Sequence, residues 1–325
     1  MNSLTKNLSI SGTEFFLDGK AFDLRGYSFF NAIFNERFCE SEEMMAVYLR
    51  KFKEYGINTL RIWCQWDFKT PDIHFVDVVP EKTSLFTMHG EIKPSYAQRL
   101  KQMILCADRL DMILEICAFA HERFYIRDEN YFPYEIIPVQ EKSIRNLTEM
   151  LRPYRNIILQ IWNECSFETV RYLNIAKSVD PDRICTSSPG FAGVLGDEEQ
   201  NRLLDVLTPH TCRSEHENFW DKAAEEIGFL LNRYHKPVID DEPARCGIVE
   251  HGGIPGGTQP WQHIQQIKNI RALGGYHIYH HDMFQNPIPH SSTPQNGIPE
   301  PDFSSFHQEV CRYIQALAKE AGDIP

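Results

Sequence analysis

The sequence predicts an α/β fold, a (β/α)8 or TIM barrel formed by a single domain over residues 1–325. Eight apolar, strand-like runs recur along the chain, each followed by a segment with helical spacing of apolar residues or by a gap of helix length. Eight such units over about 300 residues match the size of a barrel of this kind. No Ser/Gly-rich or low-complexity hinge interrupts the sequence, which favours one domain.

The elements follow one another in regular order. The predicted strands are 23–30, 57–66, 112–120, 156–164, 182–188, 203–210, 236–242 and 275–281. Helical spacing occurs over 41–56, 95–110, 167–179, 219–235 and 259–273, and Gly56 is placed to end the first helix. A doubly wound open sheet is the alternative, but the usual glycine fingerprint for phosphate binding after a first strand is missing.

Two further features orient the predicted barrel. The opening LSISGTEFFLDGKAF indicates a short hairpin that turns at Asp18-Gly19 and caps the barrel floor. The connections that leave the strands are long, at 67–94, 121–133, 243–259 and 282–302, whereas those that enter the strands are short. Because long loops at the C-terminal ends of barrel strands form active sites, we expect the site at that face.

Composition narrows the classes of partner. The formal net charge of −12, with no cluster of Lys or Arg, argues against a nucleic-acid or anionic-membrane surface. No apolar run reaches membrane-spanning length and no signal peptide is visible. Nine cysteines, an odd number without CxxC spacing, indicate reduced thiols, so a cytoplasmic protein is expected.

Two carboxylates stand at the ends of strongly apolar strands. The run IILQIWNECS (157–166) ends on Asn163 and Glu164, and the strand over 236–242 ends on Glu242. These are the fourth and seventh strands, which face each other across the mouth of an eight-stranded barrel, so the two side chains can converge. Two carboxyl groups about 5–5.5 Å apart are what a retaining glycosidase requires. Asp240 and Asp241 compete with Glu242 for this place if the strand ends earlier.

These motifs resemble glycoside hydrolase clan A, the (β/α)8 retaining glycosidases that include the cellulase-like family 5. The resemblance lies in WNE at the end of strand four, PVIxxE at strand seven, the opening FFLDGKAFDLRGYSFF and Arg61 in TLRIW. It implies that Glu164 is the acid/base and Glu242 the nucleophile. It also implies that Asn163 bonds the substrate 2-hydroxyl or the nucleophile, and that Arg61 keeps Glu242 ionised.

The resemblance extends to two histidines, and it departs from the clan at two places. His121, after strand three, and His210, at the end of strand six, match histidines of the clan, the first a sugar contact. A tyrosine that often stands two residues beyond the strand-six histidine is replaced by Cys212. The strand-eight tryptophan is also missing, and Tyr279 or His281 is offered in its place.

Aromatic residues near strand ends can stack on the C–H faces of sugars. Trp66 and Trp261 are the two for which we expect this role. The remaining tryptophans are as readily explained by ordinary packing in the core or at the rim.

The sequence thus predicts a retaining glycosidase acting on β-linked glycosides or short oligosaccharides, without cofactor or metal. One alternative is a catalytically silent carbohydrate-binding barrel. The other is a metal-dependent barrel hydrolase that uses the strand-eight histidines His277, His280 and His281 with Asp282. Strand alternation disperses these possible ligands, which disfavours the metal. The identity of the sugar and the oligomeric state are not readable from the sequence.

Overall fold

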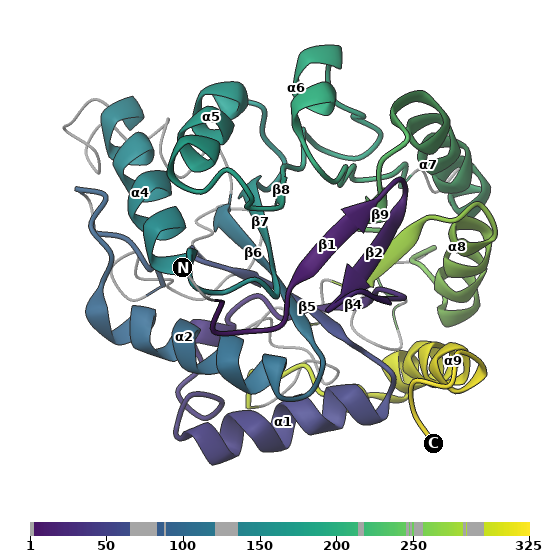
Figure 1. Ribbon diagram of the computed structural model, residues 1–325. Coiled ribbons are helices and arrows are strands. Elements are labelled where there is room, and N and C mark those ends of the chain that lie inside the picture. Colours follow the sequence, from purple (N-terminus) through teal and green to yellow (C-terminus); the bar gives the residue numbers. More distant parts are fainter. Residues whose placement is uncertain are drawn as a thin grey trace.

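The computed structural model describes residues 3–65, 83–87, 89–120, 136–213, 218–244, 247, 249, 256–281, 284 and 296–325. Helices surround a central ring of strands (Figure 1). Seven parallel strands form one curled sheet in the order β8-β7-β6-β5-β4-β10-β9. They are β4 (Arg25–Ser28), β5 (Thr59–Trp63), β6 (Ile113–Phe119), β7 (Ile157–Trp162), β8 (Cys185–Thr186), β9 (Ile239–Asp240) and β10 (Tyr276–Tyr279).

The segment over 205–210 closes the sheet into a barrel. The Val206 N–H donates to the Cys185 carbonyl of β8, and the Ile239 N–H of β9 donates to the Leu207 carbonyl at 2.9 Å. The predicted strand over 203–210 is therefore present as the link between β8 and β9, although it is not a regular strand and Leu203 ends the preceding helix. The predicted (β/α)8 barrel is confirmed.

The predicted helices lie outside the strands, with bounds within two residues of those expected. The helices are α1 (Glu42–Glu54), α2 (Pro94–Asp108), α4 (Ile136–Leu151), α5 (Thr169–Val179), α6 (Glu198–Leu203), α7 (Phe219–Tyr234), α8 (Pro260–Ala272) and α9 (Ser305–Glu320), with a short 3-10 turn η1 (Ala32–Phe34). In α1 the Ser41 hydroxyl accepts a hydrogen bond from the Met44 N–H, which caps its first turn. Gly56 follows its end with φ +75°, a left-handed conformation that glycine adopts without strain.

The barrel floor is covered by a small antiparallel sheet of β1 (Leu8–Ser11), β2 (Glu14–Leu17) and β3 (Lys20–Ala21), the purple arrows of Figure 1. The expected turn at Asp18-Gly19 joins β2 to β3, and both residues have positive φ. A second turn, at Gly12-Thr13, makes three strands where one hairpin was predicted. Phe15 and Leu17 of this sheet pack with Ile113 and Ile158 at the starts of β6 and β7, so it closes the end of the barrel opposite the strand termini.

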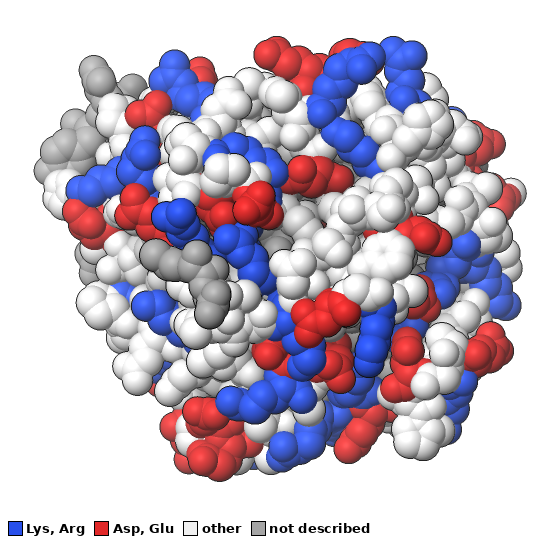
Figure 2. All heavy atoms as spheres, in the orientation of Figure 1, with Lys and Arg blue, Asp and Glu red and all other residues white. Residues whose placement is uncertain are grey.

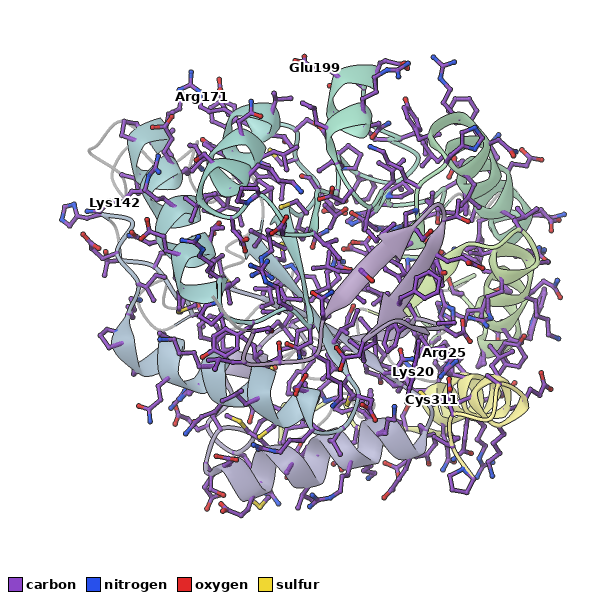
Figure 3. All side chains as sticks on the ribbon, in the orientation of Figure 1. Lys20, Arg25, Lys142, Arg171, Glu199 and Cys311 are labelled. Atoms are coloured by element: carbon purple, nitrogen blue, oxygen red, sulfur yellow. The ribbon has the colours of Figure 1, made fainter. Side chains whose placement is uncertain are left out.

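Arg25 ties the C-terminal helix to this floor. Its guanidinium is buried beside α9 (Figure 3), donates to the Gly56 carbonyl at 2.9 Å and pairs with Asp23 and Asp323. The end of the chain is thereby fixed next to the first barrel strand.

The outer surface carries both signs of charge. Lys/Arg and Asp/Glu side chains are interspersed on the face shown in Figure 2, without a broad field of one sign. Among the described residues, no helix is both long and apolar enough to cross a membrane.

Gly26 provides a test of how tightly the barrel strands pack. A Cβ at Gly26 in β4 would lie 2.3 Å from Cγ1 and 3.0 Å from the main-chain Cα of Ile278 in β10, so strand and side chain would both have to move. We expect Gly26→Ala to lower the free energy of unfolding by about 2–3 kcal/mol, a typical cost of overpacking, as measured by denaturant titration.

Gly12→Ala is the matched control, because a Cβ there meets nothing within 4 Å and only the left-handed φ of +61° opposes it. A loss of stability at Gly26 no larger than that at Gly12 would contradict the close packing of β4 on β10.

Candidate active site

Glu164 and Glu242 meet at the C-terminal face of the barrel. Glu164 lies two residues beyond β7, and Glu242 lies two residues beyond β9. One carboxylate oxygen of each and one nitrogen of His210 all lie within 4.8 Å of one another. Two strand termini 78 residues apart in the sequence are thus joined in a single site, as their positions in an eight-stranded barrel require.

His210 bridges the two carboxylates. Its Nδ1 lies 3.0 Å from Glu164 Oε1, and its Nε2 lies 3.3 Å from Glu242 Oε2. The ring is fully buried, and this burial lowers the pKa of His210 below its ordinary value despite the nearby carboxylates. The hydrogen bond of the ring is the one between Nδ1 and Glu164, whereas Nε2 lies near Glu242 without a hydrogen bond to any described residue.

Arg61 holds the nucleophile candidate from inside the barrel. Its Nη1 donates to Glu242 Oε2 at 3.0 Å, and its Nη2 donates to Asn163 Oδ1 at 2.6 Å. The guanidinium is fully buried and lies 4.5 Å above the ring of Trp63. Because the Asn163 oxygen is taken by Arg61, the orientation of the Asn163 amide is fixed with its NH2 group on the other side.

Among the three acids at the end of β9, Glu242 is the one beside Glu164. The Asp240 carboxylate accepts from the Thr211 hydroxyl at 2.9 Å and from Gln266 of α8 at 2.6 Å. Asp241 lies deeper, where its Oδ2 accepts from Gln160 at 2.9 Å. The competing assignments to Asp240 and Asp241 are therefore less favourable geometrically.

A buried acid pair lies behind Arg61. Glu115 of β6 and Asp241 are both fully buried, and they lie 3.5 and 3.2 Å from the Arg61 guanidinium. No donor of the described residues makes a hydrogen bond to either Glu115 oxygen or to Asp241 Oδ1. A proton shared between the two carboxyls satisfies both. Burial accordingly raises the pKa of Glu115 to about 7 and raises the pKa of Asp241 well above its usual range.

Arg213 is part of the site and was not predicted from the sequence. Its Nη2 lies 3.1 Å from Glu242 Oε1 and its Nη1 lies 3.6 Å from Glu164 Oε1, so one guanidinium contacts both carboxylates. It comes from the loop after His210, one residue beyond Cys212, which stands where the clan often has a tyrosine. Nothing in the local pattern of a loop residue could have indicated this contact.

At the end of β10, the eighth strand of the predicted barrel, His280 faces the carboxylates and its neighbours do not. His280 Nε2 lies 3.6 Å from Glu242 Oε1, and its Nδ1 lies 2.9 Å from the Ser28 hydroxyl of β4. Tyr279 and His281 point the other way, toward the outer helices. The Tyr279 hydroxyl bonds His307 of α9 at 2.7 Å, and the His281 ring lies 4.8 Å from that of His307. The expectation that Tyr279 or His281 lines the sugar site is therefore corrected to His280, because the alternation along β10 has the opposite phase.

Three other residues were predicted to contact the sugar: Trp66, His121 and Trp261. Trp66 and His121 lie outside the described residues. Trp261 is in the first turn of α8, where 53% of its surface is exposed and its ring lies edge-on to Trp220 at 5.2 Å. Because helices of a barrel begin at the face where strands end, this pair is at the rim of the same face.

The Glu164 backbone is held in an unusual conformation. Its φ is +54°, in the left-handed region that a residue with a side chain seldom adopts. Such outliers cost on the order of 1–3 kcal/mol and gather at functional sites. Here the turn directs the Glu164 carboxylate back over the barrel mouth toward His210.

The three ligand atoms of Glu164, His210 and Glu242 could also surround a metal ion. The guanidinium groups of Arg61 and Arg213 already lie against these carboxylates, and a cation would have to displace them or be repelled by them. The strand-eight histidines do not converge on one point, since His277 is at the floor beside Arg25 and His281 is in the helix layer. The two guanidinium groups therefore disfavour a metal ion among these three residues.

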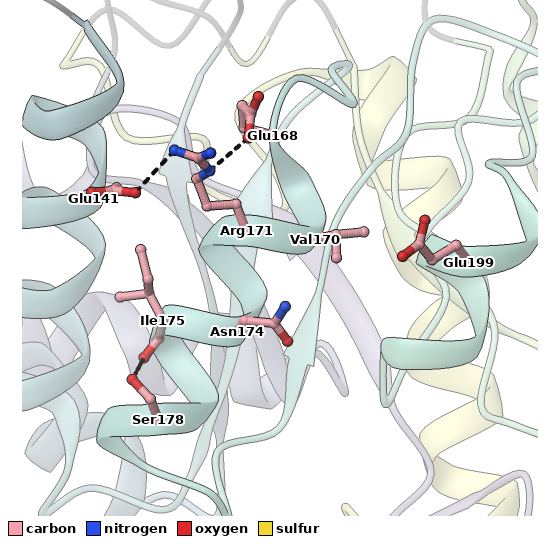
Figure 4. Close-up of a pocket in the computed structure, with 8 residues that line it drawn as sticks. All are labelled: Glu141, Glu168, Val170, Arg171, Asn174, Ile175, Ser178 and Glu199. Atoms are coloured by element: carbon pink, nitrogen blue, oxygen red, sulfur yellow. Dashed lines mark hydrogen bonds and ion pairs between the residues drawn. The ribbon is translucent and has the colours of Figure 1, made fainter.

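A separate hollow lies on the outer surface around α5, between α4 and α6 (Figure 4). Arg171 there pairs with Glu168 at 2.8 Å and with Glu141 at 3.3 Å. Exposed pairs of this kind are ordinary surface features.

The buried acid pair gives stability a specific pH dependence. The folded protein keeps the Glu115 proton up to about pH 7, whereas the unfolded chain releases it near its ordinary pKa of 4.5. Stability from this group is thus present at low pH and is lost as the pH rises through that window. Between pH 5 and 7 we expect the unfolding free energy of the wild type to fall by on the order of 2 kcal/mol more than that of Glu115→Gln.

The Gln amide supplies the donor at every pH, while the buried acids that do not contact Glu115 contribute to both proteins alike. The measurement is denaturant unfolding at a series of pH values. Equal slopes for the two proteins would show that Glu115 is not the group that retains the proton.

Among known proteins, only solved structures show a similarity to this chain, and the similarity is one of fold. No protein-family model matches the sequence, and no curated protein matches it. The structure is similar to a glycoside hydrolase (TM-score 0.68, 14% identity, covering 99% of this chain and 75% of that chain). It is also similar to a glycoside hydrolase family 5 mannosidase from Rhizomucor miehei (TM-score 0.66, 13% identity, covering 98% of this chain and 99% of that chain). A third similar structure is an endo-β-1,4-mannanase from Thermotoga petrophila (TM-score 0.60, 17% identity, covering 93% of this chain and 77% of that chain). The chain therefore has the (β/α)8 fold seen in family 5 of glycoside hydrolase clan A.

Proposed function

We propose that the protein is a retaining glycoside hydrolase that acts on β-linked glycosides or short oligosaccharides. The observation that carries the proposal is the pair of carboxylates, Glu164 and Glu242, with oxygens within 4.8 Å of each other at the barrel mouth. Retaining enzymes need carboxyl groups about 5–5.5 Å apart, whereas inverting enzymes need about 6.5–9.5 Å to admit a water molecule between them.

The reaction would proceed in two displacements. In the first, Glu242 attacks the anomeric carbon as the glycosidic C–O bond breaks, and Glu164 gives its proton to the leaving oxygen. In the second, Glu164 takes a proton from water, whose oxygen attacks the same carbon and releases Glu242 from the ester. Arg61 supports this assignment, because a buried cation 3.0 Å from Glu242 favours the ionised carboxylate that a nucleophile needs.

The surrounding groups have roles that fit this chemistry. The NH2 group of Asn163, oriented by Arg61, is placed to donate to a sugar hydroxyl or to the nucleophile. His210 and His280, both fully buried, can fix the two carboxylates or bind hydroxyls. Trp261, with Trp220, offers an aromatic surface at the rim, and Trp66 and His121 stay predicted sugar contacts.

Two features of the chain as a whole belong to the same proposal. We treat residues 1–325 as one catalytic domain. Cys39, Cys64, Cys106, Cys117, Cys185, Cys212 and Cys311 are free, which supports function in a reducing compartment such as the cytoplasm.

Trapping of the covalent intermediate tests the proposal directly. Incubation with a panel of 2-deoxy-2-fluoro β-glycosides carrying good leaving groups should yield a stable adduct, because the fluorine slows both displacements and the good leaving group keeps the first fast enough for the adduct to accumulate. Intact mass and peptide mapping should locate it on Glu242, and Glu242→Gln should give none. The sugar that reacts identifies the substrate class.

Other outcomes separate the alternatives. An adduct on Asp240 or Asp241 would keep the mechanism and change the nucleophile. Binding of sugars with no adduct and no hydrolysis would favour the silent carbohydrate-binding barrel. Hydrolysis abolished by a chelator and restored by a divalent ion would favour a metal-dependent hydrolase.

Replacement of the acid should affect substrates according to their leaving groups. We expect Glu164→Ala to lower kcat/KM for alkyl or sugar leaving groups by about 10²–10⁴-fold, and far less for dinitrophenyl glycosides, which leave without protonation. Added azide should restore turnover and give a β-glycosyl azide, identified by NMR. An α-glycosyl azide, or equal losses for both kinds of substrate, would contradict the assigned role of Glu164.

A further inference from the structure

Arg213 stands between the two carboxylates on the side opposite to Arg61. Arg61 contacts Oε2 of Glu242, and Arg213 contacts Oε1 at 3.1 Å. Arg61 contacts Glu242 of the two carboxylates, whereas Arg213 also reaches Glu164, with Nη1 3.6 Å from Glu164 Oε1. Among the described cationic side chains, Arg213 is thus the one that contacts both members of the pair.

The two displacements move one negative charge between these carboxylates. While the glycosidic bond is intact, Glu242 must be ionised and Glu164 must be protonated. In the glycosyl-enzyme, Glu242 is a neutral ester and Glu164 must be ionised to accept the proton of water. Each half of the reaction therefore has one carboxylate charged, and it is a different one each time.

We propose that Arg213 is a further catalytic residue, the counter-ion of Glu242 in the first displacement and of Glu164 in the second. This inference rests on the proposed function. Because the guanidinium has five N–H donors in a planar fork, it can face both carboxylates at once and needs only a small shift as the charge moves.

The main chain keeps Arg213 in place throughout the cycle. Its Nη2 and Nε donate to the Glu242 carbonyl at 2.9 and 3.3 Å, and that carbonyl does not change charge. The loop that carries it is fixed by the Cys212 N–H, which donates to Glu226 of α7 at 2.7 Å. The exposed ring of Phe191 lies 5.1 Å from the guanidinium carbon and covers it from the solvent side.

Other charges near Arg213 do not substitute for it. Among the described residues, the titratable groups that face it besides the two glutamates are His210 and Asp240. Asp240 bonds Thr211 and Gln266, away from the mouth. The positive charge of Arg61 is partly compensated by the Glu115–Asp241 pair, which lies 3.5 and 3.2 Å from it. Arg213 therefore adds a second positive charge beside Glu242, and it places the same charge 3.6 Å from Glu164, the carboxylate that is ionised in the glycosyl-enzyme.

The test measures the pH–rate profiles of the two displacements separately, on glycosides of the sugar that the trapping experiment identifies. Alkyl or nitrophenyl glycosides make the first displacement limiting, and dinitrophenyl glycosides make the second limiting. We expect Arg213→Gln to move the acidic limb of both pH–rate profiles upward by about one pH unit, because each carboxylate loses a positive neighbour. Arg213→Lys should keep both limbs within a few tenths of a unit while lowering the rates.

Arg171→Gln on the outer surface is the matched control for loss of one arginine charge, and its profiles should equal those of the wild type. A shift confined to the first displacement, or lower rates with no shift in either profile, would overturn the role in both steps. Unchanged circular dichroism and melting temperature separate these outcomes from misfolding, and a comparison with Arg213→Lys repeats the test if the Gln variant unfolds. Absence of any adduct or turnover in the wild type would instead refute the proposed function.

Discussion

The buried guanidinium of Arg61, which projects from β5, connects this strand to three other strands of the barrel. It contacts Glu115 from β6, Asn163 and Gln160 from β7 and its end, and Asp241 and Glu242 from the end of β9. A buried cation is tolerated only when carboxylates and carbonyl oxygens surround it, and those groups in turn need the cation. Removing it would leave acids uncompensated in the barrel interior. The positions of Asn163 and Glu242, and through them the candidate active site, depend on this one charge.

The interior around Arg61 is polar at a cost in stability. Glu115 and Asp241 are buried so close together that both cannot be ionised at once. The backbone of Glu164 has a left-handed conformation, which also costs stability. The compensation comes from the rest of the barrel: apolar side chains between strands and helices, the three-stranded sheet that seals the floor, and the close approach of β4 to β10 at Gly26. Such local conflicts within an otherwise consistent fold are expected where selection has favoured chemistry over stability.

The sequence predicted those parts of the structure that depend on periodicity. Apolar runs located the barrel strands, and the ends of two of them placed Glu164 and Glu242. It failed where the outcome depended on which way a short strand faces or where a loop travels. In GYHIYHH both faces of the strand carry a tyrosine and at least one histidine, so the sequence could not show that His280 points inward and Tyr279 outward. Arg213 lies in a loop whose path is set by Glu226 and Asp240, both distant in sequence. The partner of Glu115 was equally hidden, since Asp241 directly follows β9 and is 126 residues further along the chain (241 − 115).

Arg213 places a cation at the barrel mouth, next to position 212, where the clan that this sequence resembles often has a neutral tyrosine. This difference affects how the charges of Glu242 and Arg61 are balanced. A tyrosine hydroxyl near the nucleophile would donate one hydrogen bond and add no charge, leaving the strand-two arginine to balance the carboxylate. Here position 212 is a cysteine, and the next residue supplies a full positive charge to the same carboxylate. The charge of Arg61 can then be balanced from inside the barrel by Glu115 and Asp241, acids that would otherwise compete with Glu242 for it. The buried acid pair and Arg213 thus form two layers: Glu115 and Asp241 surround Arg61 inside the barrel, and Arg213 contacts Glu164 and Glu242 at its mouth.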